Sequence, residues 1–325
     1  MIRTLCRCIV LASWLTASSA GAQALDKLVF GTNWLAEAEH GGFYQAVAEG
    51  TYRKHGLDVT IRMGGPQVNP LQLLAAKQID VAMGDDLQTL GALEQGLPIT
   101  TIGATFQKNP TVIIAHPGVR SLVDLKGKPI AIGAASNTTF WPWLKEHFGF
   151  TDDQKRPYAF SVQPFLVDPQ LSQQGFATSE PFSIEQAGVK PVVFLLADLG
   201  YPPYSESLVV RRADVQARAD ALRRFLVASA EGWKSYLANP APAHALIRRD
   251  NPQMTDALLA FGHATMKQYG IVTGGDAPRL GILTMTDKRW QSTFAFVQSA
   301  GLGKPGFDYR PAYTLDLIRD VHVLP

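Results

Sequence analysis

The chain has 325 residues, of which 46% are hydrophobic and 18% are charged, so it is long enough and apolar enough for two moderate hydrophobic cores. Its formal net charge is +2, and residues 1–24 contribute two arginines and no acidic residue, so the rest of the chain carries 28 basic and 28 acidic side chains. A neutral chain lacks the basic surface that nucleic acids and anionic membranes attract. We therefore expect no nucleic-acid partner.

Residues 1–24 have the three regions of a secretory signal peptide in order. Two arginines come first, an apolar run over residues 9–17 follows, and small residues lead to a cleavage site near residues 22–24. That run is too short to span a bilayer. A buried N-terminal helix is the alternative, but the pattern predicts a periplasmic protein from which this segment is cleaved. Because Cys6 and Cys8 are the two cysteines, the mature chain would have no disulfide, thiol nucleophile or cysteine-bound metal.

Beyond the signal, short apolar segments alternate with amphipathic ones. The first run predicts strands at 27–34, 57–65, 79–85 and 99–106, separated by helices at 43–56, 69–78 and 87–96. A second run predicts strands at 111–117, 129–133, 158–165 and 192–198, with helices at 121–128 and 138–149. The remainder predicts three amphipathic helices, at 214–239, 254–270 and 287–301, between Pro- and Gly-rich breaks.

This alternation predicts an α/β fold with two lobes, each a mostly parallel sheet covered by helices. We expect residues 25–109 to begin lobe I, residues 110–208 to form lobe II, and residues 209–325 to complete lobe I with the C-terminal helices. The chain would cross between the lobes near 108–111 and 206–211. Ligands of open α/β sheets bind beyond the carboxyl ends of the strands, so the cleft between the lobes is the expected site.

Several stretches in this order resemble the periplasmic solute-binding proteins of ABC importers, notably "GTNWLAEAEHGGFYQAVAEGTYRKHGLDVTI", "LLAAKQIDVAMGD" and "SLVDLKGKPIAIG". The closest subgroup binds aromatic heterocycles, chiefly pyrimidine precursors of thiamine, and is related in fold to fungal thiamine-pyrimidine synthases. The resemblance implies a type II-like binding-protein fold with a two-segment hinge. It also implies a monomer that captures a small molecule and delivers it to an inner-membrane ABC permease. Binders of sulfonate, taurine and nitrate share much of this framework and are the alternative.

The resemblance implies roles for individual residues. An Asn-Trp pair ends the first strand in the pyrimidine-related group and is matched by Asn33 and Trp34, while the histidine that follows is matched by His40. A Glu-Pro pair in the second lobe is matched by Glu180 and Pro181. We expect Glu180 to make a charge-assisted hydrogen bond to an aminopyrimidine, although a lone glutamate is more commonly a solvated surface residue.

The same resemblance argues against synthase activity. Gly84 and Gln88 occupy the positions that align with a lysine and a histidine of the fungal enzymes, and the mature chain has no cysteine-rich run. The sequence also has no Walker loop, dinucleotide fingerprint or nucleophile elbow, and its seven histidines have no chelating spacing. We predict a binding protein with no cofactor and no metal, and keep the synthase as the alternative of another class.

Other candidates depend on position in the chain. Gly41 and Gly42 predict a helix N-terminus open to a ligand, or alternatively a flexible loop. Of Asp85 and Asp86, one would reach the cleft and the other would cap the next helix. Tyr204 would be a lid or hinge packing. Trp34 and Tyr44 would stack on a planar ligand or, alternatively, belong to the core; the same alternative holds for Trp141, and Phe43 is a further aromatic candidate. In the sulfonate and nitrate binders that the sequence resembles, the turn that matches "SNT" at 136–138 cradles the anion, so these residues would hold an anionic ligand group. The full expected ligand set is Asn33, Trp34, His40, Phe43, Tyr44, Asp85, Ser136, Asn137, Thr138, Trp141, Glu180 and Tyr204.

Overall fold

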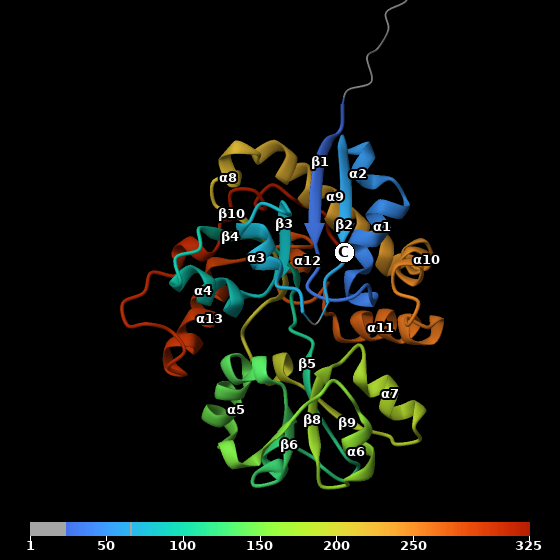
Figure 1. Ribbon diagram of the computed structural model, residues 1–325, viewed down its shortest axis with the longest axis vertical. Helices are drawn as coiled ribbons and strands as arrows, with labels where there is room; N and C mark the ends of the chain where they lie inside the picture. The colour runs from blue at the N-terminus through green and yellow to red at the C-terminus, as the bar shows by residue number, and fades with distance from the viewer. Residues whose placement is uncertain (1–23, 66) are drawn as a thin grey trace, which may run out of the picture.

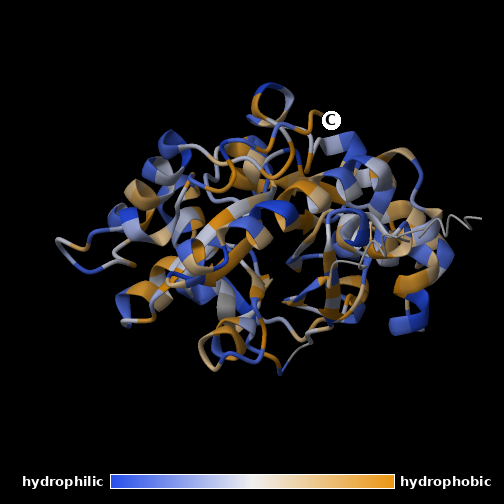
Figure 2. Ribbon diagram, turned by 90° about the horizontal axis from the view of Figure 1, so that it is seen from above, coloured by the Kyte–Doolittle hydropathy of each residue, from blue (hydrophilic) through white to orange (hydrophobic). Residues whose placement is uncertain are grey.

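A computed structural model of the protein describes residues 24–65 and 67–325, so residues 1–23 of the predicted export signal lie outside it. The chain forms two α/β lobes, one above the other in Figure 1, and the predicted fold class is confirmed. In the described part, no helix is long and apolar enough to cross a membrane. Apolar residues gather on the strands and on the inner sides of the helices, with polar residues at the periphery (Figure 2).

The first lobe contains a five-stranded sheet in the order β2-β1-β3-β10-β4. Its strands are β1 (Asp26–Gly31), β2 (Leu57–Arg62), β3 (Val81–Gly84), β4 (Ile99–Phe106) and β10 (Ser205–Arg211). The early helices are α1 (Gly41–Ala48), α2 (Thr51–Lys54), α3 (Pro70–Ala75) and α4 (Asp86–Glu94). The chain returns to this lobe to form α8 (Asp214–Ala217), α9 (Ala219–Ala238), α10 (Ala241–Asp250), α11 (Asp256–Tyr269), α12 (Ala277–Leu280) and α13 (Asp287–Ser299).

The second lobe repeats this layout with the order β7-β6-β8-β5-β9. Its strands are β5 (Thr111–Ala115), β6 (Ile130–Ile132), β7 (Lys155–Pro157), β8 (Ser172–Phe176) and β9 (Val192–Leu195), and its helices are α5 (Phe140–Phe148), α6 (Gln163–Val167) and α7 (Glu180–Gln186). In each sheet one strand, β10 or β5, runs antiparallel to both of its neighbours. It is the strand with which the chain enters from the other lobe.

The structure differs from the predicted elements between residues 155 and 176, where one predicted strand does not form and two strands that were not predicted do. The expected strand at 158–165 is a loop followed by α6, because Pro164 is well tolerated in the first turn of a helix. The strands at this place are β7 and β8. The sequence of β8, "SQQGF", is too polar to read as a strand, and it is held by its pairing with β5 and β6.

The chain crosses between the lobes at residues 107–110 and 196–204. The second crossing therefore precedes residues 206–211, which form β10 because the apolar run Leu208–Val210 is buried between β3 and β4. Arg289 of α13 holds both crossings. Its guanidinium donates to the carbonyl oxygens of Gln107 at 3.2 Å and Pro203 at 3.4 Å, and lies 4.8 Å from the ring centroid of Tyr204.

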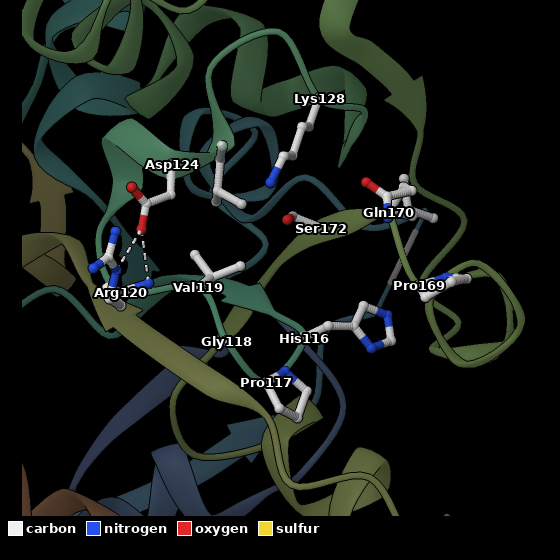
Figure 3. A pocket seen from close by; sticks show the side chains of 12 residues that line it. His116, Pro117, Gly118, Val119, Arg120, Asp124, Lys128, Pro169, Gln170 and Ser172 are labelled. Atoms are coloured by element: carbon white, nitrogen blue, oxygen red, sulfur yellow. Dashed lines mark hydrogen bonds and ion pairs between the residues drawn. The ribbon is translucent and has the colours of Figure 1, made fainter.

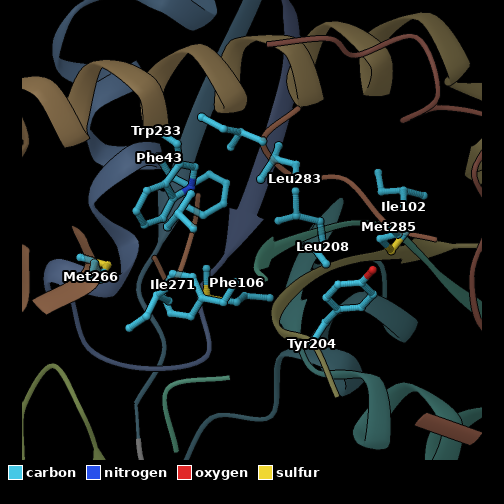
Figure 4. Close-up of a cluster of buried hydrophobic side chains, with 14 of the residues drawn as sticks. Phe43, Ile102, Phe106, Tyr204, Leu208, Trp233, Met266, Ile271, Leu283 and Met285 are labelled. Carbon is cyan, nitrogen blue, oxygen red and sulfur yellow. The ribbon is translucent and has the colours of Figure 1, made fainter. Parts of the chain in front are cut away.

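The glycine pair at the start of α1 is explained by helix packing. A Cβ atom at Gly42 would overlap the indole of Trp233, and one at Gly41 would overlap the ring of Tyr236, both on α9. Trp233 and Phe43 lie together in the large buried cluster beneath α9 (Figure 4). The pair lets α1 and α9 approach closely and does not open a helix N-terminus to a ligand, so this part of the sequence prediction is corrected.

Candidate ligand-binding site

A cavity of about 160 Å³ lies between the two lobes, next to both crossings. Lobe I contributes the N-terminus of α4, and lobe II contributes the turn before α5 together with β8. The cavity is lined by Asp85, Leu87, Gln88, Asn109, Thr111, Ser136, Thr139, Phe140, Gln174, Gly175, Phe176, Tyr201, Pro203 and Ser205. Asp85 is the sole charged residue in this described lining, and no Lys, Arg or His is part of it.

Asp85 serves two purposes. One carboxylate oxygen accepts the backbone N–H of Gln88 at 2.8 Å and caps α4, while the residue as a whole lines the cavity. Burial raises the Asp85 pKa to about 6, although the hydrogen bonds from the backbone N–H groups of Gln88 and Leu87 act to lower it. Asp86 is fully buried and accepts from the Tyr204 backbone N–H at 2.9 Å and the Ser207 hydroxyl at 3.2 Å. We expected one aspartate to cap the helix and the other to reach the cleft. In the structure Asp85 does both, and Asp86 ties α4 to β10.

The polar turn of the second lobe contributes one of its three predicted residues to the cavity. Ser136 lines it and donates to Oε1 of Gln174 at 2.7 Å. The Gln174 oxygen also accepts the Gly133 N–H at 2.5 Å, so the NH2 group is the donor that Gln174 offers to the cavity. Asn137 and Thr138 are exposed and are not part of the lining, and Asn137 accepts from Lys155 at 2.8 Å on the surface of the lobe.

Asn33, which is half-buried, and the buried His40 form a hydrogen-bonded chain with a glutamate that the sequence analysis did not select. Asn33 Nδ2 donates to Oε1 of Glu206 at 2.9 Å, and Asn33 Oδ1 lies 3.1 Å from Nε2 of His40. Burial lowers the His40 pKa to about 3, so its ring is neutral near pH 7. This chain lies at the carboxyl end of β1, where the sequence predicted the site.

Glu206 and three further carboxyl groups, from both lobes, form a cluster here. Burial raises the Glu37 pKa well above its usual value, and the carboxylates of Glu39, Glu206 and Glu180 raise it further. Glu39 accepts from the Thr178 hydroxyl across the cleft. Within the described residues, no group of three or more acidic, His or Cys side chains is arranged to hold a metal ion. Because burial raises the pKa values of Glu37, Glu39 and Glu206, these carboxyl groups favour their protonated form and offer O–H donors as well as acceptors.

Lobe II contributes Glu180 to this cluster and places Tyr158 and Phe160 beside it. The Glu180 carboxylate accepts from the Tyr158 hydroxyl and from the Phe176 backbone N–H, each at 2.8 Å. Trp34 of lobe I and Phe160 of lobe II have ring centroids 5.6 Å apart. Phe160 is 68% exposed, and its backbone is in the left-handed region, with φ 54°. Its ring lies at the surface where the lobes meet. Trp34, Glu180, Asn33 and His40 lie near the junction of the lobes but are not part of the described cavity lining, so their predicted ligand contacts stay predictions.

Four of the predicted aromatic ligand contacts are packing residues. Phe43 and Tyr44 are buried in the core of lobe I. Trp141 is buried against Phe150, and its indole N–H donates to Asp152 at 2.8 Å, away from the cavity lining. Tyr204 is fully buried and accepts the Thr286 backbone N–H at 3.2 Å, so it belongs to the hinge packing. Tyr44 and Trp141 are therefore core residues and Tyr204 packs in the hinge, which were the alternatives to a ligand contact in the sequence analysis.

Sequence reasoning missed several residues at the site because no local pattern marks them. Gln174 lies in a strand that the sequence did not predict, and Phe160 lies in a predicted strand that does not form. Glu206 has one visible signal, which is a charged residue at the start of the otherwise apolar strand "SLVV". The missed residues of the cavity and the carboxyl cluster include Glu37, Glu39, Phe140, Phe160, Gln174 and Glu206.

A larger recess of about 490 Å³ lies on lobe II alone (Figure 3). It is lined by residues 116–128 and 169–172, and its charged groups are largely committed. Arg120 pairs with Asp124 at 3.8 Å, and His116 Nε2 lies 2.9 Å from the Phe165 carbonyl oxygen and 3.1 Å from that of Asp168. Because lobe I does not contribute to it, this recess has no means of linking ligand binding to lobe closure.

Comparison with known proteins places the chain in a family. Residues 37–243 match the family described as NMT1/THI5 like, which is more than half of the chain. The chain belongs to that family. A riboflavin-binding protein, RibY of Chloroflexus aurantiacus, is 23% identical over 90% of this chain and 86% of its own length. A formylaminopyrimidine-binding protein of Halalkalibacterium halodurans is 23% identical over 75% of this chain and 76% of its own length.

The fold is shared with solved structures of the same architecture. The crystal structure of the periplasmic aliphatic sulphonate binding protein SsuA from Escherichia coli superimposes with a TM-score of 0.66. It is 15% identical and covers 88% of this chain and 91% of that chain. The two-lobe fold of this NMT1/THI5-like chain is therefore that of periplasmic binding proteins.

Proposed function

We propose that the protein is the periplasmic binding component of an ABC importer and captures a single-ring, nitrogen-rich heterocycle of the aminopyrimidine class. The observation that carries this proposal is the charge of the cleft. The described lining of the cavity has one charged residue, Asp85, and further carboxyl groups lie beside it with no basic residue in the lining. Such a site favours ligands that bring N–H donors or a positive charge, and it repels sulfonate and nitrate.

Hydrogen-bonding groups from both lobes match an aminopyrimidine edge. Asp85 of lobe I accepts hydrogen bonds, and the Gln174 NH2 group of lobe II donates them. An aminopyrimidine has an exocyclic amine as donor beside a ring nitrogen as acceptor, so it can bind both. A ligand that contacts both lobes favours the closed arrangement in proportion to its differential affinity for that state.

The size of the cavity supports a single ring. A cavity of about 150 Å³ holds a benzene molecule, so about 160 Å³ accommodates one substituted six-membered ring but not three fused rings. This favours the ligand class named for the formylaminopyrimidine-binding relative over a flavin. A synthase of the fungal kind is disfavoured because Gly84 and Gln88 stand where its lysine and histidine align, and no lysine is in the described lining.

Calorimetry with formylaminopyrimidine, riboflavin and taurine tests the proposal, together with native mass spectrometry of the protein purified from its own periplasm. We expect binding of the pyrimidine alone. Asp85→Asn should weaken it about tenfold or more, because the asparagine still caps α4 but has no charge. Asp320→Asn, at an exposed position, is the control. Binding of taurine or riboflavin without binding of the pyrimidine would refute the proposal.

A further inference from the structure

The side-chain amide of Gln174 on β8 is held in one orientation by two donors of its own lobe. The backbone N–H of Gly133 donates to Oε1 of Gln174 at 2.5 Å, and the Ser136 hydroxyl donates to the same oxygen at 2.7 Å. A backbone N–H cannot accept a hydrogen bond, so the amide cannot turn over and place its NH2 group there. A Cβ atom at Gly133 would lie 3.3 Å from both Oε1 and Nε2 of Gln174, so the glycine leaves the space that the amide occupies. The fold therefore fixes the side on which Gln174 carries its donors.

The NH2 group is the end of Gln174 that stays available to a ligand. Gln174 is half-buried and is part of the cavity lining. Both hydrogen bonds of its side chain end on Oε1, and neither N–H of the amide donates to another residue in the described part of the chain. Amide N–H groups inside a protein normally have an acceptor. The acceptor of this one must therefore come from water or from a ligand in the cavity.

Strand β8 presents an aromatic ring to the cavity together with this amide. Phe176 follows Gln174 by two residues, so the two side chains leave β8 on the same side, and both line the cavity. A flat ligand that packs against Phe176 would bring the edge of its ring toward the Gln174 amide. Lobe I contributes the Asp85 carboxyl group to the same lining. The two lobes thus offer different groups, an uncharged donor from lobe II and an acid from lobe I.

We propose that Gln174 is a specificity-determining residue of the cleft, whose NH2 group donates to an unprotonated ring nitrogen of the bound heterocycle. This inference rests on the proposed function and narrows it, because the ligand then needs a ring nitrogen with a free lone pair and not only an amine. A ring with C–H at that position would take the amide out of water and leave its donor unpaired, and a ring with N–H there would direct a donor at a donor. The protein would discriminate against both.

Gln174→Glu and Gln174→Met test the inference. The glutamate keeps one oxygen on Gly133 and Ser136 and puts a second acceptor where the NH2 group was, whereas methionine removes the donor without adding a charge. The affinities of wild type and variants are measured by calorimetry at neutral pH for formylaminopyrimidine and for its analogue with a benzene ring in place of the pyrimidine ring. Wild type should prefer the pyrimidine by about 10- to 100-fold, and both variants should lose about tenfold of that preference.

Gln186→Glu is the matched control. Gln186 is exposed on α7, so the same chemical change there should leave both affinities and the preference as in wild type. If wild type binds the pyrimidine but does not prefer it to the benzene analogue, or if both Gln174 variants keep the preference, this inference alone is overturned. If wild type binds neither compound, the proposed function and this inference fail together.

Discussion

Replacement of Gly42 by alanine tests whether the glycine pair is needed for the close packing of α1 against α9. The added Cβ would lie within 3.0 Å of three atoms of the Trp233 ring. That ring is fully buried and packs edge-on against Phe43 and Phe106, with centroids 5.8 Å and 5.9 Å away, so it has no free space into which to move. A Cβ atom at Gly232 of α9 would likewise lie within 3.0 Å of the carbonyl oxygen of Gly42, so the two helices already pack backbone against backbone and leave no room for the new methyl group.

The expected magnitude follows from two opposing effects. Overpacking of a well-filled core costs about 1–3 kcal/mol, and this position belongs at the upper end because both helices are fixed. Alanine recovers about 1 kcal/mol through its better helix propensity. We therefore expect Gly42→Ala to lower the free energy of unfolding by about 2 kcal/mol.

A matched control is present in the same lobe. Gly91 lies within α4, and a Cβ there would meet no atom within 4 Å, so Gly91→Ala should raise the free energy of unfolding by up to about 1 kcal/mol. Urea unfolding followed by tryptophan fluorescence and circular dichroism measures both variants. If Gly42→Ala is as stable as Gly91→Ala and instead loses ligand affinity, the packing explanation is wrong and the glycine faces a ligand.

Two further predictions concern the cleft and the hinge. The free energy of unfolding should fall as pH rises from 6.5 to about 8, by up to about 1.4 kcal/mol per pH unit for each group that still holds its proton. Burial raises the pKa of Glu206 to about 8 and of Asp86 to about 7, so the native state keeps protons that the unfolded state has lost. The lowered pKa of His40 makes stability rise with pH instead, but that effect ends near pH 6.5. Glu206→Gln should flatten this fall in thermal unfolding, and an unchanged slope would contradict the assignment. Arg289→Met removes the hydrogen bonds to the two crossings, so the ligand-free protein should have a larger radius of gyration in X-ray scattering. Ligand affinity should weaken about threefold to tenfold. An unchanged radius would show that the guanidinium does not set the angle between the lobes.

The place of the cleft followed from chain order, because ligands collect beyond the carboxyl ends of the strands. Asp85 follows the third strand and lines the cavity there, whereas Asn33 and Trp34, which match a pair in known binders, are not part of the described lining. The positions of Tyr44 and Trp141 were harder to predict, because their helices bury several faces. The spacing of apolar residues does not tell which of those faces meets the other lobe.

The sequence by itself determined the class of the fold, because alternating apolar strands and amphipathic helices can bury their faces in few other ways. The meaning of individual residues was decided by tertiary structure. Gly42 is a glycine because Trp233, far along the chain, packs against it. Glu206 joins the cleft because β10 returns to the first sheet between β3 and β4, which brings its carboxyl group to Asn33. Contacts between distant segments leave no local periodicity, so they appear only when the sheet is assembled.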